Sequence, residues 1–182
     1  MTSVLFVSGS PAPTSKSARL AEHVRARLDA AGFSTAHVRV RDLPAEPLLA
    51  GDASEPAIAD AVAALDKADG VVFVTPTYKA SYSGLIKTFL DLLPQRALTD
   101  KAVLPLAVGG SLAHVLMLDY ALRPVLHSLG VRHSVQGCFL IESALDATSE
   151  EFVVGDLQRD MLDRAIGNFT RALTDPAATQ AA

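Results

Sequence analysis

Residues 4–20 read VLFVSGSPAPTSKSARL, and this stretch predicts a strand, a loop and the start of a helix in that order. The apolar run Val4–Val7 has no polar alternation, which is typical of a strand buried on both faces of a parallel sheet. A loop rich in serine and proline follows this run. Apolar residues then recur at helical spacing from Leu20 to Leu28, and Gly32 is well suited to end the helix.

The alternation of strand and helix continues through the chain. Apolar runs at 71–74 and 103–108 predict buried strands, whereas residues 36–41 alternate apolar with polar, as an edge strand does. A last run consists of Val135 and residues 138–141. Gly137 interrupts it, which predicts a fifth strand with a bulge or a bend. Helical spacing predicts further helices over about 54–65 with Ser54 as its N-cap, 85–92, 115–129 and from about 150 onward.

Five strands that alternate with helices indicate a doubly wound α/β domain. Because the alternating strand comes second, we expect a flavodoxin-like five-stranded parallel sheet in the order 2-1-3-4-5, with helices on both faces. Pro105 lies in a central strand and has no N–H for the ladder, so pairing should break locally there. Residues 1–174 are expected to form this single domain, and residues 175–182 a flexible tail.

The composition of the chain excludes several classes of protein. It has 182 residues, 49% of them hydrophobic, which is enough for one buried core. The net charge of −4 gives no basic surface for nucleic acid, and no apolar run suits a membrane span or a secretion signal. The single cysteine, Cys138, lies in an apolar strand and is expected in the core. With no spacing typical of metal ligands, these features favour a cytoplasmic protein without a metal site.

Three loops follow the predicted central strands, at residues 8–17, 75–84 and 109–114. In an open parallel sheet, ligands bind beyond the carboxyl ends of such strands. The first loop ends where a helix begins, and free N–H groups at a helix start favour an anion. Its serine and threonine hydroxyls and the Lys16 ammonium suit a terminal phosphate, although the same serines also suit simple helix capping. The loop lacks the glycines of the dinucleotide and nucleoside-triphosphate motifs.

The second and third loops suit a planar ligand with polar edges. Tyr78 and Tyr82 stand among small residues in the second loop, so that an aromatic side chain can cover a ring. Gly109 and Gly110 precede Ser111 in the third loop, which lets main-chain N–H groups approach a ligand closely. An ordinary turn and an ordinary strand-to-helix connection remain the alternative interpretations.

The chain resembles the NAD(P)H-dependent FMN reductases, and most closely the alkanesulfonate-utilisation reductases of bacteria. The resemblance rests on Gly9-Ser10-Pro11, on TPTYKASYSGLIKTFLD at 75–91, on Gly109-Gly110-Ser111 with His114, and on DYALRP at 119–124. It implies that the first loop holds the FMN phosphate and that the other two hold the isoalloxazine ring. The cofactor-binding residues expected from it are Ser10, Ser15, Lys16, Ser17, Pro76, Thr77, Tyr78, Lys79, Ser83, Gly84, Gly109, Gly110, Ser111 and His114.

The resemblance also implies an activity, in which NADPH or NADH reduces FMN. Hydride passes between stacked rings, so no catalytic side chain is expected, and the protein supplies positioning and electrostatic support. The product FMNH₂ would pass to a partner monooxygenase that desulfonates alkanesulfonates, and the reductase would be a homodimer or homotetramer. A quinone or azo reductase with fixed FMN and a flavodoxin-type electron carrier are the alternatives. Lys16, Arg19 and Lys79 are candidate partners for the 2′-phosphate of NADPH, and the sequence does not choose among them.

Pro124 falls inside the helix predicted at 115–129. It removes the hydrogen bond to the carbonyl of Tyr120, so a kink or a π-bulge is expected at that residue, or else a helix broken in two. In the reductases that the chain resembles, a tyrosine at this place lies in a widened turn at a subunit interface near the flavin. The resemblance thus implies that Tyr120 influences flavin retention or transfer.

Overall fold

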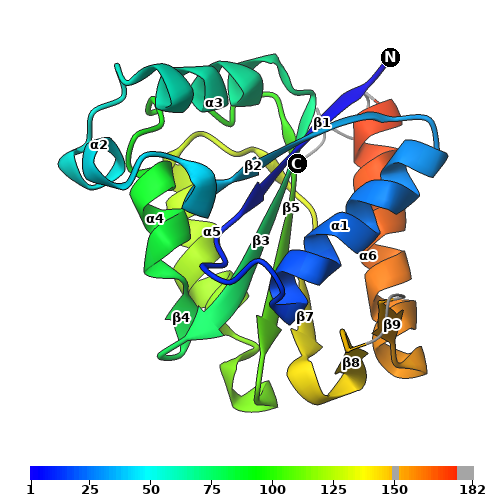
Figure 1. The fold of residues 1–182 in the computed structure, drawn as a ribbon. Helices are drawn as coiled ribbons and strands as arrows, with labels where there is room; N and C mark the ends of the chain where they lie inside the picture. The colour runs from blue at the N-terminus through cyan, green and yellow to red at the C-terminus, as the bar shows by residue number, and fades with distance from the viewer. Residues whose placement is uncertain (149–151, 176–182) are drawn as a thin grey trace.

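The computed structural model describes residues 1–148 and 152–175. A twisted parallel sheet runs through its centre with helices on both faces (Figure 1). The parallel strands are β1 (Ser3–Ser8), β2 (Ser34–Arg39), β3 (Gly70–Tyr78), β5 (Ala102–Gly109), β6 (His133–Ser134) and β7 (Cys138–Ile141). Their order is β2-β1-β3-β5-β6, with β7 also beside β5, which confirms the predicted flavodoxin-like order.

Two apolar clusters hold the helices against the sheet. On one face, α1 (Lys16–Ala30) and α6 (Asp156–Thr174) pack against β-strand side chains such as Phe6. On the other face, the cluster includes Phe73 and residues of α3 (Pro56–Lys67), α4 (Gly84–Leu90) and α5 (Arg123–Ser128). The two groups of helices lie on opposite sides of the strands in Figure 1. Burial on both faces is why β1, β3 and β5 are continuous apolar runs in the sequence.

The fifth strand is split beside Pro105, as the missing N–H of this proline leads one to expect. β5 pairs without interruption with β3, where Pro105 stands opposite Phe73. On its other side, β5 pairs first with β6 and then with β7, and neither pairing includes Pro105. A Cβ on Gly137 would lie 2.9 Å from the Pro105 carbonyl oxygen, so only glycine fits in the bend between β6 and β7.

Several elements differ from those expected. The cap of α3 is Glu55, whose carboxylate accepts from the N–H of Ile58 at 3.0 Å, because the hydroxyl of Ser54 donates to Asp52 at 2.6 Å instead. Helix α6 begins at Asp156, after a small antiparallel pair formed by β8 (Leu145–Asp146) and β9 (Val153–Val154). Helix α2 (Ala45–Ala50) and the short strand β4 (Ser81–Tyr82) were not expected. Of the predicted tail, residues 176–182 lie outside the described residues.

The helix expected over 115–129 is in fact composite. A 3-10 turn at Leu112–His114 leads to a π-helix at Leu118–Leu122, and α5 follows directly. Within the described ranges 1–148 and 152–175, no helix has both the length and the apolar character of a membrane span.

Candidate functional site

The three predicted loops meet at the carboxyl edge of β1, β3 and β5. The Ser83 hydroxyl donates to the carbonyl oxygen of Gly9 at 2.6 Å, which joins the second loop to the first. The N–H of Gly9 donates to the carbonyl of Val74 at 3.0 Å. A Cβ on Gly109 would lie 2.9 Å from Thr77 Oγ1, so the third loop is in contact with the second. The loops therefore form one continuous edge, as the strand order predicts.

The serines of the first loop form a connected group of hydroxyls at the start of α1. Ser15 Oγ lies 2.6 Å from Ser10 Oγ and 3.2 Å from Ser17 Oγ. Ser15 is also the N-cap, since its hydroxyl accepts from the N–H of Ala18 at 3.1 Å. Ser10 and Ser17 are buried. The expected capping role is thus confirmed for Ser15, and the structure brings the three predicted serines of this loop together.

Lys16 is in the first turn of α1, but its ammonium is directed to a different part of the edge. Its Nζ donates to the carbonyl oxygen of Glu142 at 2.6 Å, in the turn that follows β7. Thr14, a further hydroxyl of the first loop, is exposed. The N–H groups of Lys16 and Ser17 lie in the first helical turn, where no preceding helical carbonyl faces them.

The second loop is a tight hairpin between β3 and β4. Lys79 and Ala80 form its tip with φ angles of 50° and 63°, the left-handed region that a two-residue hairpin turn requires. Neither is glycine or asparagine, so each carries a conformational cost of about 1–2 kcal/mol. Strain of this kind tends to concentrate at functional sites. The hairpin leaves Tyr78 48% exposed at the rim of the edge.

Ser83 and Gly84 connect the hairpin to α4. Ser83 is buried, and besides its bond to Gly9 its hydroxyl accepts from the N–H of Ile86 at 3.2 Å, as the N-cap of α4. Its own N–H donates to Thr75 Oγ1 at 2.9 Å. Each of these bonds is to another protein group, which suits a residue that positions the loops. Gly84 is the exposed first residue of α4.

The third loop leaves β5 at Gly109, where no side chain fits. A Cβ there would lie 2.5 Å from the Phe139 ring as well as against Thr77. Thr77 Oγ1 is a buried side-chain oxygen without a hydrogen-bond partner among the described residues. Gly110 and Ser111 are exposed, and the Ser111 hydroxyl accepts from the N–H of Ala113 at 3.2 Å.

Two further predicted residues follow Ser111. His114 is half-buried at the end of the 3-10 turn, where its N–H donates to the Ser111 carbonyl at 3.2 Å. Tyr120 lies in the π-helix and is 78% exposed, which confirms the π-bulge hypothesis and makes the broken helix wrong. The N–H of Arg123 donates to the carbonyl of Leu118, five residues earlier, because Pro124 has no N–H for the Tyr120 carbonyl.

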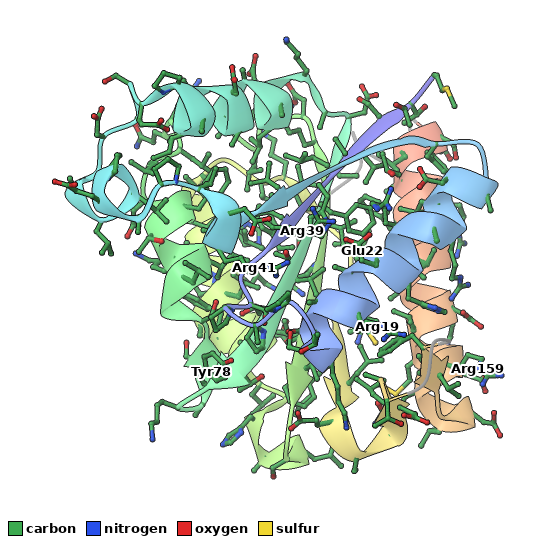
Figure 2. The ribbon with its side chains drawn as sticks, viewed as in Figure 1. Arg19, Glu22, Arg39, Arg41, Tyr78 and Arg159 are labelled. Carbon is green, nitrogen blue, oxygen red and sulfur yellow. The ribbon has the colours of Figure 1, made fainter. Side chains whose placement is uncertain are left out.

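A hollow lined by arginines lies beside the first loop and was missed by the sequence reasoning. Arg19 of α1 lines it together with Arg39, the last residue of β2, and Arg41 of the 3-10 turn that follows, and Figure 2 shows these three with Glu22. Part of the signal was available, since His37 and Arg39 alternate along an edge strand and so share one face. Arg41, which was expected in the same strand, lies in a 3-10 turn at Val40–Asp42 instead. What the sequence lacked was the position of α1 against that face.

Glu22 and His37 form a hydrogen-bonded pair at the floor of this hollow. Burial raises the pKa of Glu22, but hydrogen bonds from Arg39 and Arg25 and the neighbouring charges outweigh it and lower that pKa to about 2. His37 Nδ1 lies 3.1 Å from Glu22 Oε1, and its Nε2 lies 2.9 Å from Ser8 Oγ. Burial is the largest influence on His37 and lowers its pKa, against the opposing effect of Glu22.

Cys138 is buried in β7, as expected for a core residue, and burial raises the pKa of its thiol to about 11. A thiol of this kind is a poor nucleophile at neutral pH. Over residues 1–148 and 152–175, no group of three or more His, Cys, Asp or Glu side chains is arranged to hold a metal ion.

Comparison with known proteins adds to this geometry. Residues 2–146 match the family described as NADPH-dependent FMN reductase. An FMN reductase (NADPH) of Pseudomonas putida is 46% identical over 140 residues, which are 77% of this chain and 71% of that protein. An FMN reductase (NADPH) of Escherichia coli is 40% identical over 171 residues, 93% of this chain and 89% of that protein. The crystal structure of an apo NADH:FMN oxidoreductase has a TM-score of 0.88 and 47% identity, and the match covers 97% of this chain and 93% of that one.

Proposed function

The chain belongs to the NADPH-dependent FMN reductase family, and from that premise we propose how its three-loop edge binds FMN. The protein is an oxidoreductase that uses NAD(P)H to reduce FMN. We place the FMN phosphate at the start of α1 and the isoalloxazine ring across the second and third loops. The observation that carries this placement is the group of three serine hydroxyls at the helix start, next to a strained hairpin and a glycine-bearing turn.

The first loop fits a phosphate dianion. The hydroxyls of Ser10, Ser15 and Ser17 lie within one hydrogen-bonded chain, and hydroxyls can turn their hydrogens toward an anion. The N–H groups of the first turn of α1 and the positive end of its dipole favour negative charge at the same point. Lys16, bonded to the Glu142 carbonyl, adds positive charge nearby and ties this loop to the turn after β7.

The second and third loops fit a flat ring with hydrogen-bonding edges. Thr77 Oγ1, beside Gly109, is a buried hydroxyl for which the described part of the chain supplies no hydrogen-bond partner, so this edge offers a polar group that a ligand can satisfy. Gly110 and Ser111 present exposed backbone in front of it. Tyr78 supplies an aromatic side chain at the rim, with Pro76, Lys79 and Gly84 in the same loop. His114 closes the third loop.

The chemistry needs little from the side chains beyond positioning. When bound, FMN supplies the acceptor for the two electrons of the reduced nicotinamide. The serines fix one end of the flavin, and the strained hairpin fixes the position of Tyr78 and Lys79 at the other. Backbone N–H groups at Gly110 and Ser111 support negative charge on the ring edge. We assign no general acid or base and no metal.

We propose that the reduced flavin leaves for a partner monooxygenase that desulfonates alkanesulfonates. The resemblance in the motifs supports this role, and so does the open rim, where Tyr78 and Gly110 are exposed to solvent. A flavin held at such an edge can exchange more readily than one enclosed in the fold. The single buried cysteine suits a reducing compartment, and we place the protein, as one domain, in the cytoplasm.

We also propose that the chain forms a homodimer or homotetramer through the segment that contains the π-helix. Leu112, Val115, Leu116 and Tyr120 are 61%, 40%, 58% and 78% exposed. These four residues follow one another closely in the segment directly after the third loop. A patch of exposed apolar side chains commonly marks an interface. Tyr120 would then reach the interface close to the flavin and influence its retention or transfer.

Purified protein tests the proposed function and its alternatives. We expect a colourless protein that oxidises NAD(P)H only when free FMN is added, in proportion to the FMN supplied, and whose FMNH₂ product sustains an alkanesulfonate monooxygenase. A yellow protein that keeps its flavin through gel filtration and reduces quinones would instead be a quinone or azo reductase. A stable flavin that NAD(P)H does not reduce would indicate an electron carrier.

A further inference from the structure

The hollow lined by arginines is a second site, next to the first loop of the three-loop edge. Its volume is about 320 Å³, and it lies between α1 and the end of β2. Pro13 of the first loop forms part of its wall. Arg41 also joins the two sites, since its guanidinium donates to the carbonyl oxygen of Ser10 at 3.4 Å. A ligand in this hollow would therefore lie just past the proposed FMN phosphate.

Arg41 is a cation that the protein only partly satisfies. Its side chain is 17% exposed, so most of it is out of water. Its polar contacts with the described residues are long: 3.4 Å to the Ser10 carbonyl and 3.4 Å to the carboxylate of Asp42. A guanidinium has five N–H donors, and a largely buried one is stable only with good acceptors. Two long contacts leave most of these donors able to bind an anion.

The carboxylates around the hollow do not cancel its positive charge. Glu22 accepts from Arg39 at 2.5 Å and from Arg25 at 2.9 Å, so it is already neutralised. Asp42 is 59% exposed and well hydrated. Burial lowers the pKa of His37, so this imidazole is neutral at neutral pH. Asp42, 3.4 Å from Arg41 and mostly in water, therefore offsets the positive charge of Arg41 only weakly.

We propose that this hollow binds the 2′-phosphate of NADPH, so that the enzyme prefers NADPH to NADH. The inference rests on the proposed function, because it takes the nicotinamide to stack on a flavin held at the adjacent edge. A dinucleotide is longer than FMN. If it runs along the flavin in the direction of the flavin's own phosphate, its adenosine end extends past the first loop and reaches the arginines. Arginine is well suited to phosphate because its planar fork can donate two parallel hydrogen bonds.

The other candidate cations are less suitable. Lys16 is bonded to the Glu142 carbonyl on the opposite side of the first loop. Lys79 stands at the tip of the hairpin beside Tyr78, at the ring end of the proposed FMN site. An NADPH molecule that ran in the opposite direction would place its 2′-phosphate near Lys79, so Lys79 marks the competing arrangement.

Steady-state kinetics with both nicotinamides at saturating FMN test the proposal. In the wild type, we expect a higher kcat/KM for NADPH than for NADH. Arg41→Gln should reduce the ratio of the two kcat/KM values by about tenfold, the effect expected from the loss of a charge-assisted bond to phosphate. Arg41→Lys keeps the positive charge but loses the planar fork, so its ratio of kcat/KM values should lie between those of the wild type and Arg41→Gln. The matched control is Arg159→Gln. Arg159 lies on α6 and lines another hollow (Figure 2), so the loss of its charge should leave the ratio of kcat/KM values unchanged.

Calorimetry on the wild type supplies a second readout that needs no variant. Adenosine 2′,5′-bisphosphate should bind at least tenfold more tightly than adenosine 5′-monophosphate, and Arg41→Gln should remove that difference. Equal affinity for the two nucleotides would overturn the proposal. So would loss of the NADPH preference in Lys79→Gln but not in Arg41→Gln. If either result is found and NADH still reduces FMN, the phosphate site is refuted and the proposed FMN reductase function is kept. No reduction of FMN with either nicotinamide would contradict the proposed function itself.

Discussion

The hydroxyl of Ser83 donates to the carbonyl oxygen of Gly9 at 2.6 Å, across a sequence separation of 74 residues. The bond is buried, and it joins the loop proposed for the phosphate to the loop proposed for the ring. Gly9 has no room for a side chain at this contact, since a Cβ would lie 2.6 Å from Ser83 Oγ. The side chain of Ser83 thus ties together the two halves of the proposed flavin site.

We expect Ser83→Ala to destabilise the protein and to weaken FMN binding. The change leaves the buried Gly9 carbonyl without this donor and removes the N-cap of α4, and together these cost about 2 kcal/mol. Urea unfolding and FMN titration measure the two effects. Ser128→Ala removes an exposed hydroxyl that donates to the Val125 carbonyl at 2.7 Å, three residues earlier in the chain, and should change stability by less than about 0.5 kcal/mol. Equal behaviour of the two variants would refute the role of Ser83.

Gly109→Ala should disturb the contact between the second and third loops. The new methyl group would meet the Phe139 ring and Thr77 Oγ1, and overpacking of this kind costs about 1–3 kcal/mol. FMN affinity should fall as Thr77 is displaced. The control is Gly167→Ala in α6, where nothing lies within 4 Å of the added Cβ. That change should raise stability by about 0.5–1 kcal/mol and leave FMN binding unaltered.

Glu22 should make stability depend on pH in the acid range. Its folded pKa of about 2 lies below the ordinary 4.5, so the folded state favours the ionised form. The resulting stability is fully present above about pH 4.5 and is lost as the pH falls toward 2. Urea unfolding of the wild type and of Glu22→Gln should therefore differ most at pH 7 and converge at low pH. A constant difference from pH 7 to pH 3 would show that the pKa of Glu22 is not lowered.

The patch beside the π-helix should control self-association. Leu116→Glu adds a charge to a side chain that is 58% exposed, so it should not unfold the monomer. If the patch is the subunit interface, sedimentation should show a shift to a smaller species. Leu49→Glu, in a leucine of α2 that is 76% exposed, is the control that should leave the assembly intact. An unchanged assembly in Leu116→Glu would exclude this surface as the interface.

Pro124→Ala should relieve the constraint that widens the helix at Tyr120. The new N–H can donate to the Tyr120 carbonyl, which favours ordinary α-helical spacing through this segment. We expect a more stable monomer and a change in the flavin dissociation rate, measured by unfolding and by stopped-flow fluorescence. If neither quantity changes, the π-helix has no part in flavin exchange.

Much of the fold was predictable because a strand that is buried on both faces of the sheet is a continuous apolar run in the sequence. Val4–Val7 and residues 71–74 have no polar alternation, so they had to be central strands. The edge position of β2 followed from its alternation. Pro105 predicted the split of the fifth strand, since a residue without an N–H is tolerated where the hydrogen bonding to the neighbouring strand is interrupted. These features depend on local chemistry, which the sequence carries directly.

What the sequence did not show depends on contacts between distant segments. Ser54 looks like a helix cap, but its hydroxyl is taken by Asp52, and Glu55 caps α3 instead. Ser83 was expected beside the ligand, yet its buried hydroxyl bonds to Gly9. The arginine hollow exists because α1 crosses the end of β2, which no local pattern reveals. The loops could be named from the strand order, whereas the roles within them required the packing.

The central claim is that the start of α1 grips the phosphate of FMN, and a titration with FMN and riboflavin tests it most directly. The two ligands share the isoalloxazine ring and differ only in the phosphate. We predict that the wild type binds FMN at least tenfold more tightly than riboflavin, and that Ser17→Ala reduces this ratio while riboflavin affinity stays constant. Equal affinity for both ligands in the wild type, or an undiminished ratio in Ser17→Ala, would contradict the account.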